Sequence, residues 1–190
     1  MITIGIDHTQ VDGRVYSNVR MRDMFVALAA KVKKFTDVKL QRPAPAKLAG
    51  GPNDPITQES LPGRYQQFLK PNDILVAETG TSAVATGGLL MPEGAVYHNQ
   101  TLWGSIGWAT GTALGTAIAD QSRRTVLITG EGSHQLTANE IGNYGRHGVK
   151  PVIFVLNNSG YGVERVLEEY PDWVYNDLAP WDYHTLPAAL

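Results

Sequence analysis

The sequence predicts an α/β fold built on a doubly wound parallel sheet, and three observations support this prediction. Short runs of β-branched and other apolar residues, at 125–129 and 152–156, have the composition of buried strands. Stretches with helical spacing, or rich in alanine, lie between such runs. Glycine-rich or polar turns follow the runs directly, as they do at the strand ends of parallel sheets. A short piece of a preceding α/β domain is expected before this sheet.

The first 55 residues predict a strand, a helix and a linker. Residues 2–6 alternate as a short strand does, and 20–35 have the spacing of an amphipathic helix. Lysines near the end of that helix suit the negative end of its dipole. Prolines and glycines between 41 and 55 disfavour a helix or a central strand, so a domain boundary is expected there. The apolar face of the helix would consist of Met24, Phe25, Leu28, Val32 and Phe35.

The later elements alternate in the order that a parallel sheet requires. A helix is expected over 56–69, starting late or bending, because a proline inside a helix costs about 3 kcal/mol. A strand at 73–78 leads into a loop at 79–82, and a second strand lies near Val96. A small-residue helix is expected over 104–119. Another helix is expected over 137–147, with Gly148 as its stop.

Composition describes an ordinary soluble domain with a small appendage. The chain has 190 residues, of which 43% are hydrophobic and 18% charged. Its 16 basic and 18 acidic side chains give a net charge of -2 without a basic cluster, which argues against nucleic acids and membranes as partners. The absence of cysteine excludes disulfides and thiolate metal sites. No apolar run approaches the roughly 20 residues needed to cross a bilayer, and a cytoplasmic protein is expected.

Two motifs at strand ends predict a site for a metal ion and a diphosphate. Gly130-Glu131-Gly132-Ser133 follows one apolar run, and the stretch 157–164 follows the next. Ligands bind at this edge of a parallel sheet, near the N-terminal ends of the following helices. Magnesium prefers hard oxygen ligands, which the Glu131 carboxylate, the Asn158 amide and the Gly160 carbonyl can supply.

Neighbouring residues fit the same interpretation. Gly130 and Gly132 remove Cβ atoms where the backbone must approach phosphate oxygens, and Ser133 either caps the next helix or donates to the anion. Each motif by itself is more often an ordinary turn or loop, and Glu164 alone would be a solvated acid in the first turn of a helix. Their occurrence in order at successive strand ends favours the functional interpretation.

Four motifs together resemble the thiamine-diphosphate-dependent 2-oxo-acid decarboxylases, typified by pyruvate and indolepyruvate decarboxylases. The resemblance extends over about 54–181, and in that family this region binds the diphosphate of the cofactor. The motifs, in family order, are Ala77-Glu78-Thr79-Gly80-Thr81-Ser82-Ala83, Leu102-Trp103-Gly104-Ser105-Ile106-Gly107, Gly130-Glu131-Gly132-Ser133 with Gln135-Leu136-Thr137, and Asn157-Asn158-Ser159-Gly160-Tyr161-Gly162-Val163-Glu164.

The resemblance implies a role for each matching residue. Glu131, Asn158 and the Gly160 carbonyl would ligate Mg²⁺, and Ser133, with Gly130 and Gly132, would lie against the diphosphate. The remaining cofactor contacts would come from Thr79, Thr81, Gly104, Ser105 and Ile106.

Three of these implied roles are specific. Gly104 would accept a hydrogen bond from the amine of the aminopyrimidine. Ile106 would be the apolar wedge that bends the cofactor, although ordinary core packing is the alternative for this residue. Glu164 would be the catalytic acid that handles protons after carbon dioxide leaves.

Three departures from the family pattern stand out. The family usually has aspartate at the position of Glu131, whose extra methylene moves the charge outward by about 1.5 Å. Metal affinity is therefore expected to be weaker, or shifted towards calcium or manganese. Many relatives have threonine at the position of Gly162. The chain also has no counterpart to the family's pyrimidine-binding domain.

The sequence is accordingly interpreted as a fragment of a decarboxylase. Residues 1–38 would be the end of the family's middle domain, 39–55 a linker, and 56–190 the diphosphate- and Mg²⁺-binding domain, incomplete at its C-terminus. The full-length parent would be a homodimer or homotetramer, with active sites between subunits, so the fragment alone is not expected to turn over substrate.

The leading hypothesis is non-oxidative decarboxylation of a small 2-oxo acid to an aldehyde and CO₂, with thiamine diphosphate and Mg²⁺ as cofactors. Pyruvate, branched-chain, phenyl- and indole-pyruvates all remain open as substrates. One alternative is a non-catalytic metal-diphosphate-binding or assembly module, and another is a carboligase of the acetolactate-synthase type.

Overall fold

The structure is a computed structural model that describes residues 1–33 and 44–190. Contacts divide the chain into two compact units, Met1–Gln41 and Arg42–Leu190. The division lies within the segment 39–55 that the sequence predicts to be a linker. Residues 34–35 of the first predicted helix, and 39–43 of this linker, lie outside the described residues.

The first unit is an antiparallel meander followed by one helix. Its strands are β1 (Ile2–Ile4), β2 (His8–Val11) and β3 (Arg14–Ser17), and the helix is α1 (Met21–Ala29). A two-residue turn joins β2 to β3, with positive φ angles at Asp12 and Gly13 as this kind of hairpin requires. The sequence predicted only the first strand, because the other two are short and rich in polar residues, and β3 is exposed throughout.

The prediction for the first helix was too long. Helix α1 ends at Ala29, and its last turn closes on the Leu28 carbonyl, which accepts from the N–H groups of Lys31 and Val32. The predicted apolar face is not buried either, since Phe25 is 56% exposed and Val32 is 64% exposed.

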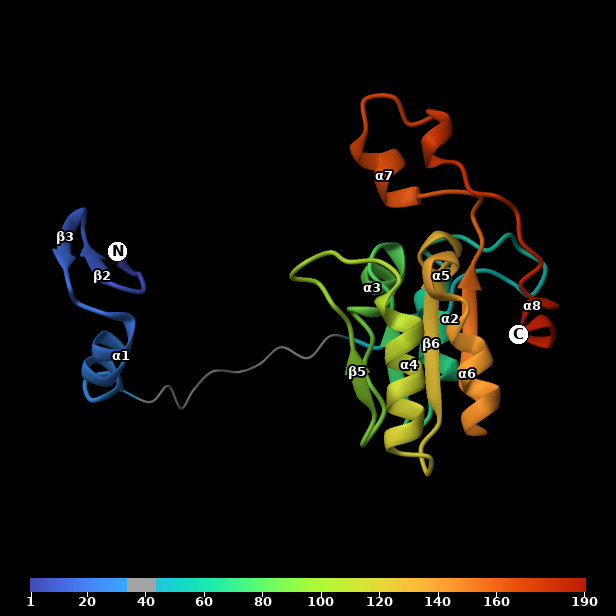
Figure 1. Ribbon diagram of the computed structural model, residues 1–190, viewed down its shortest axis with the longest axis horizontal. Helices are drawn as coiled ribbons and strands as arrows, with labels where there is room; N and C mark the ends of the chain where they lie inside the picture. The colour runs from blue at the N-terminus through green and yellow to red at the C-terminus, as the bar shows by residue number, and fades with distance from the viewer. Residues whose placement is uncertain (34–43) are drawn as a thin grey trace. The chain divides into compact units, whose positions relative to one another are not determined.

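The second unit contains the predicted parallel sheet. Its strands β4 (Ile74–Ala77), β5 (Val96–His98), β6 (Thr125–Gly130) and β7 (Val152–Leu156) lie in the order β5-β4-β6-β7, and neighbouring strands are all parallel (Figure 1). After β5 the chain returns across β4 to form β6. The strand order therefore reverses between β4 and β6, which confirms the doubly wound α/β sheet.

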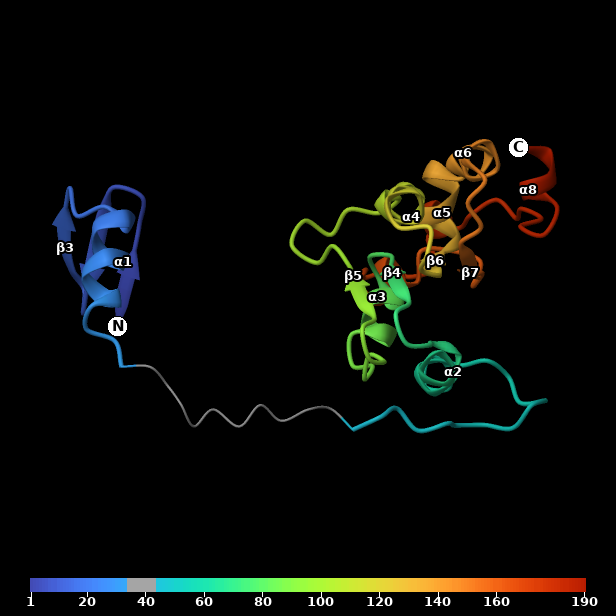
Figure 2. The same cartoon turned by 90° about the horizontal axis from the view of Figure 1, so that it is seen from below.

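Helices cover both faces of this sheet, as Figure 2 shows. Helices α4 (Trp108–Ala119) and α6 (Glu140–His147) lie on one face, and α2 (Leu61–Phe68) and α3 (Thr81–Thr86) on the other. Successive residues of β4 and β6 point to opposite faces and so enter different cores. One core contains Ile74, Val76, Ala109, Ala113, Ala117, Leu127, Tyr144 and Val149, and the other Tyr65, Leu69, Leu75, Ala85, Leu89, Val126 and Ile128.

Local features explain where helices α2 and α4 start. Helix α2 starts late, at Leu61, as predicted, and Pro62 is in its first turn, where a proline is tolerated. The next residue must be glycine, because a Cβ on Gly63 would lie 2.3 Å from the Lys47 carbonyl oxygen. Helix α4 starts at Trp108 rather than 104, after Gly107 in the left-handed conformation.

Two predicted loops are helical instead. Helix α5 (Glu131–Thr137) includes most of the glycine motif, and α6 starts at Glu140 rather than 137. Helix α3 starts at Thr81, inside the loop predicted at 79–82. The chain continues through α7 (Gly162–Leu167), the 3₁₀ helix η1 (Val174–Asn176) and α8 (Leu186–Ala189). Within the described residues, no helix combines the length and apolar character needed to span a membrane.

Candidate functional site

The candidate site lies at the carboxyl ends of β4, β6 and β7. Glu131 is the first residue of α5, directly after β6, and Asn158 follows β7 in the loop before α7. Strands β6 and β7 are direct neighbours, with Gly130 paired to Leu156 at their ends. The fold therefore brings the two sequence motifs together at one edge of the sheet.

Glu131 is almost completely buried, at 2% exposure. Its Oε1 accepts hydrogen bonds from the backbone N–H of Asn158, at 3.2 Å, and of Gly160, at 2.8 Å. These bonds fix the loop after β7 against the start of α5. The longer side chain of glutamate reaches this backbone directly, so its extra methylene is accommodated inside the protein.

The side-chain amide of Asn158 faces the same carboxylate. Its inner atom lies 3.0 Å from Oε1 and 3.2 Å from Oε2 of Glu131, and 2.8 Å from the Gly160 carbonyl oxygen. With nitrogen inward, the amide donates to all three oxygens. With oxygen inward, only acceptors face one another, and a shared cation would stabilise that arrangement.

The spacing of these oxygens fits a magnesium ion. Magnesium–oxygen distances of 2.0–2.1 Å in an octahedron place adjacent ligands about 3 Å apart. The donor set has one carboxylate, one amide and one main-chain carbonyl, so it differs from clusters of acids and histidines. No group of three or more His, Cys, Asp or Glu side chains suited to a metal occurs within the described residues.

The two glycines of the motif have different surroundings. A Cβ on Gly130 would meet nothing within 4 Å, which leaves the backbone there open to a ligand. A Cβ on Gly132 would lie 2.5 Å from Cε1 of Tyr161 and 2.7 Å from Cδ1 of Leu178, so protein packing already requires this glycine. Ser133 is buried inside α5 and makes no side-chain cap to the following helix, so the capping interpretation of Ser133 was wrong.

The segment 104–107 lies against α5 and the end of β4. Thr137 donates to the Gly107 carbonyl at 2.7 Å, and Ser105 donates its N–H to Gln100 Oε1 at 3.0 Å. Gly104 has a φ of +62° with open space where a side chain would be. Ile106 is 40% exposed and belongs to neither core cluster, which argues against the core-packing alternative.

Thr79 and Thr81 lie at the end of β4. The Thr79 hydroxyl bonds to the carbonyls of Gln100 and Ser105 and accepts from Trp108 Nε1, so this hydroxyl is used within the protein. Thr81 is the first residue of α3 and lines a cavity of about 1080 Å³, which also reaches Asn157 and Asn158.

Glu164 lies in the first turn of α7 with an exposed side chain, which matches the alternative of a solvated acid at a helix start. The start of α7 reaches the end of β4, because a Cβ on Gly80 would lie 3.5 Å from Cγ2 of Val163. Arg165 holds the base of the α7 segment by donating to the carbonyls of Ser159 and Asn176 and to the Asp177 carboxylate. Sequence reasoning had no signal for this arginine, whose partners lie 6 to 12 residues away along the chain.

Glu78 is a further buried residue to which the sequence assigned no role. It follows β4 directly, is 0% exposed, and accepts from the N–H groups of Thr79, Gly107 and Ala109. An acid directly after a fully apolar strand was the available signal in the sequence.

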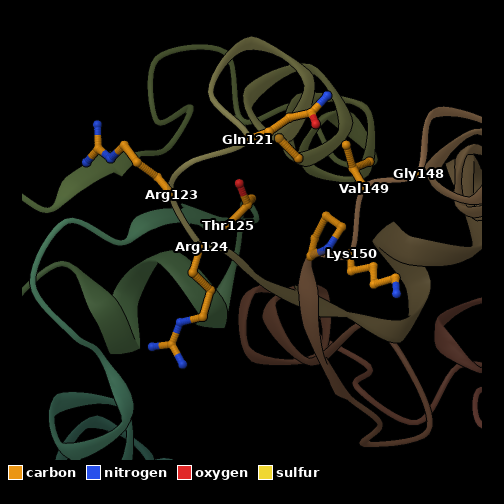
Figure 3. A pocket seen from close by; sticks show the side chains of 9 residues that line it. Gln121, Arg123, Arg124, Thr125, Gly148, Val149 and Lys150 are labelled. Atoms are coloured by element: carbon orange, nitrogen blue, oxygen red, sulfur yellow. The ribbon is translucent and has the colours of Figure 1, made fainter.

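A separate cavity of about 380 Å³ lies at the opposite edge of the sheet, near the starts of β6 and β7 (Figure 3). Arg123 and Arg124 line it, but their guanidinium groups point in different directions and are already used. Arg124 pairs with Asp73 and donates to the Phe68 carbonyl, and Arg123 donates to the carbonyls of Asn72, Asp73 and Gly94. Because both arginines bond to groups of the protein itself, they stabilise this edge of the sheet. The carboxyl edge therefore remains the candidate site.

Comparison with known families gives one match over most of the second unit. The family described as "Thiamine pyrophosphate enzyme, C-terminal TPP binding domain" matches residues 78–189. That range includes the glycine motif, the segment 104–107 and the loop after β7.

Individual relatives are named as decarboxylases. Pyruvate decarboxylase isozyme 3 of Saccharomyces cerevisiae is 35% identical over 188 residues, which cover 95% of this chain and 33% of the yeast protein. Alpha-keto-acid decarboxylase of Mycobacterium avium is 36% identical over 195 residues, covering 100% of this chain and 34% of the relative. The corresponding Mycobacterium tuberculosis protein is 41% identical over 140 residues, covering 73% of this chain and 24% of the relative. The chain thus spans about a third or less of the length of these relatives.

Proposed function

The chain belongs to the thiamine pyrophosphate enzymes through their C-terminal TPP-binding domain, and from this premise we propose that it supplies the diphosphate- and Mg²⁺-binding part of a 2-oxo-acid decarboxylase. The proposed reaction is the non-oxidative conversion of a small 2-oxo acid to an aldehyde and CO₂. The names of the relatives, pyruvate decarboxylase and alpha-keto-acid decarboxylase, support this substrate class.

One observation carries the proposal. The inner atom of the Asn158 amide lies 3.0 and 3.2 Å from the two Glu131 carboxylate oxygens and 2.8 Å from the Gly160 carbonyl oxygen, at the carboxyl edge of the sheet. A set of three oxygens at this spacing suits Mg²⁺, which in turn binds phosphate oxygens. The adjoining N-terminal turn of α5 leaves backbone space open at Gly130.

Each of the chain's residues then has a defined task. Glu131, Asn158 and the Gly160 carbonyl hold the metal ion, and Gly130, Gly132 and Ser133 lie against the diphosphate. The ring end of the cofactor is held by Thr79, Thr81, Gly104, Ser105 and Ile106.

Thiamine diphosphate, when bound, supplies the carbanion and the electron sink that decarboxylation needs. Glu164 transfers the proton as the catalytic acid. Because Glu164 is exposed here, its pocket requires a second surface. We propose that a pyrimidine-binding domain provides this surface, in a cytoplasmic homodimer or homotetramer.

Calorimetric titration of the chain with thiamine diphosphate in the presence of Mg²⁺ tests the proposal. Glu131→Gln removes the charge of the metal ligand while keeping its size, and binding should weaken by about tenfold or more. The exposed Glu93 offers a matched control, since Glu93→Gln makes the same chemical change away from the site. Undetectable binding by the wild-type chain, or equal binding by Glu131→Gln, would contradict the proposal.

A binding module without turnover is the second candidate function, and the exposure of Glu164 favours it. Adding the pyrimidine-binding domain of a relative distinguishes the two candidates. Aldehyde formation that is restored by this domain, and lost in Glu164→Gln, supports the lyase. Cofactor binding without restored activity supports the module, and a carboligated product in place of the aldehyde would identify a carboligase.

A further inference from the structure

Glu78 places a carboxylate where three backbone segments meet. Its Oε1 accepts from the N–H of Thr79 at 2.9 Å, and its Oε2 accepts from the N–H of Gly107 at 3.2 Å and of Ala109 at 3.3 Å. The side chain is completely buried, and its own N–H donates to the Ile128 carbonyl of β6 at 2.8 Å. A single side chain therefore connects the end of β4, the segment before α4 and the first turn of α4.

Burial and hydrogen bonding act on this carboxylate in opposite directions. Burial raises the pKa of Glu78, and the three backbone donors lower it by a smaller amount. The N-terminal end of the 12-residue helix α4 favours the ionised form. An ionised carboxylate can accept all three bonds, whereas a protonated acid or an amide loses acceptor capacity.

The bonds from Glu78 belong to a set that defines the course of residues 104–107. Gly107 is held from both sides, because its N–H donates to Glu78 and its carbonyl accepts from Thr137 at 2.7 Å. Ser105 is held by the Thr79 hydroxyl and by Gln100. Gly104 and Ile106 lie next to these anchored residues and face open space or solvent.

We propose that Glu78 is a positioning residue, which shapes the segment 104–107 for the ring end of thiamine diphosphate without touching the diphosphate or the metal ion. This inference rests on the proposed function, since it takes Gly104 and Ile106 as contacts of the cofactor rings. The metal ligands lie on β6–α5 and after β7, and none of them bonds to Glu78. Glu78 should therefore affect one end of the cofactor and leave the other unchanged.

Two probes separate the ends of the cofactor. Inorganic pyrophosphate with Mg²⁺ uses only the diphosphate site, whereas thiamine diphosphate with Mg²⁺ also uses 104–107. In Glu78→Gln one carboxylate oxygen becomes an NH₂ group, which cannot accept from the backbone N–H groups. The segment 104–107 therefore loses a hydrogen bond that holds it. We expect thiamine diphosphate to bind about tenfold more weakly and pyrophosphate to bind within about twofold of wild type.

Two further variants keep the test decisive. Glu93→Gln, at an exposed position, should bind both probes as wild type does. Thr137→Val removes the second anchor of Gly107 without changing Glu78, and it should also weaken thiamine diphosphate selectively. Thr137→Val carries the test if Glu78→Gln does not fold.

Hydrogen exchange provides a readout that does not depend on the ligand. The amides of Gly107 and Ala109 should exchange faster in Glu78→Gln, while the amides of Asn158 and Gly160 should be unchanged.

The possible outcomes distinguish this inference from the proposed function. Equal loss for both probes would show that Glu78 has only a structural role, and no loss for either would also overturn the inference. If the wild-type chain binds neither probe, the proposed function fails, and the assigned role of Glu78 fails with it.

Discussion

At the level of single residues, Asn158 is the side chain whose orientation decides what the site can hold. Its amide can donate to Glu131 and Gly160 when nitrogen points inward, or present oxygen to a cation when rotated. The metal-free site can therefore satisfy its own hydrogen bonds. Binding of a cation has to replace three such bonds, each worth about 1 kcal/mol.

Asn158→Asp should make folding dependent on metal. A second carboxylate would lie about 3 Å from Glu131, and two ionised acids at that distance repel each other. The melting temperature should fall in the absence of Mg²⁺ at pH 7.5 and recover when Mg²⁺ is added, with a loss of about 1 kcal/mol. Asn157→Asp, the same change one residue earlier, should show a much smaller response to Mg²⁺ in the same thermal scans.

His134 should make stability depend on pH. It is 1% exposed, its Nδ1 lies 3.2 Å from the Thr110 hydroxyl, and burial lowers its pKa. The unfolded chain then takes up a proton near pH 6.5 that the folded chain resists. The contribution of neutral His134 to the free energy of unfolding is present above pH 6.5. It is lost as the pH falls from 6.5 towards the lowered pKa of the folded state. The raised pKa of Glu78 acts in the opposite sense, so its contribution is lost as the pH rises.

Variants isolate the histidine contribution. Chemical unfolding between pH 5.5 and 7.5 should show a flatter dependence of the free energy of unfolding in His134→Gln than in wild type. The exposed His147 is the matched control, and His147→Gln should keep the wild-type slope. A wild-type slope in His134→Gln would show that other groups cause the pH dependence.

The sequence could suggest the proposed oxygen donors because their residue types and strand-end positions are local features. The fold places the Asn158 amide within 3.2 Å of the Glu131 carboxylate and of the Gly160 carbonyl, and their role as metal ligands stays a prediction. Glu78 and Arg165 could not be assigned roles in this way, because most of their partners are backbone groups of other segments. Only the folded chain shows that Glu78 meets Gly107, or that Arg165 meets the Asn176 carbonyl.

At the level of elements, helix α5 shows how packing overrides local sequence preference. Its first residues include Gly132 and Ser133, which are weak helix formers, and the sequence predicted a helix only from Thr137 onwards. Tertiary contacts compensate, since Gly132 packs closely against the Tyr161 ring and Thr137 bonds to Gly107. The central strands β4 and β6 were predicted well because their apolar runs depend on burial rather than on turn geometry.

The two glycines at the start of α5 should respond differently to alanine. Gly132→Ala places a Cβ 2.5 Å from Tyr161, and the resulting shift should cost about 1–3 kcal/mol in the free energy of unfolding. Gly130→Ala meets open space at a φ of −77° and should leave stability nearly unchanged. Thermal unfolding measures both.

Cofactor binding gives a second comparison for these variants. Gly130→Ala should weaken thiamine diphosphate binding despite its stability, because the added methyl group faces the proposed diphosphate site. Full affinity in Gly130→Ala would remove that residue from the site.

At the level of the whole molecule, every proposed ligand lies in the unit Arg42–Leu190. A chain that begins at residue 44 should therefore bind Mg²⁺ and thiamine diphosphate within about twofold of the full chain, since independent sites behave additively. Calorimetric titration of both chains tests this expectation. A loss of affinity much larger than twofold would assign Met1–Gln41 a part in the site.

The two units also differ in how well the sequence predicted them. The parallel sheet has long buried runs and a regular alternation of elements, which are strong signals. The meander of the first unit has strands of three or four residues with little burial, so composition carried little information about it.

Because β6 pairs directly with β7, binding of the proposed ion depends on the register between these two strands. Gly130 pairs with Leu156, two residues before Asn158. A slip of β7 by one position would carry the amide about 3.3 Å away and turn its neighbours to the wrong face. A misaligned chain could then no longer chelate the ion. The cation would therefore stabilise only the correct strand register during folding.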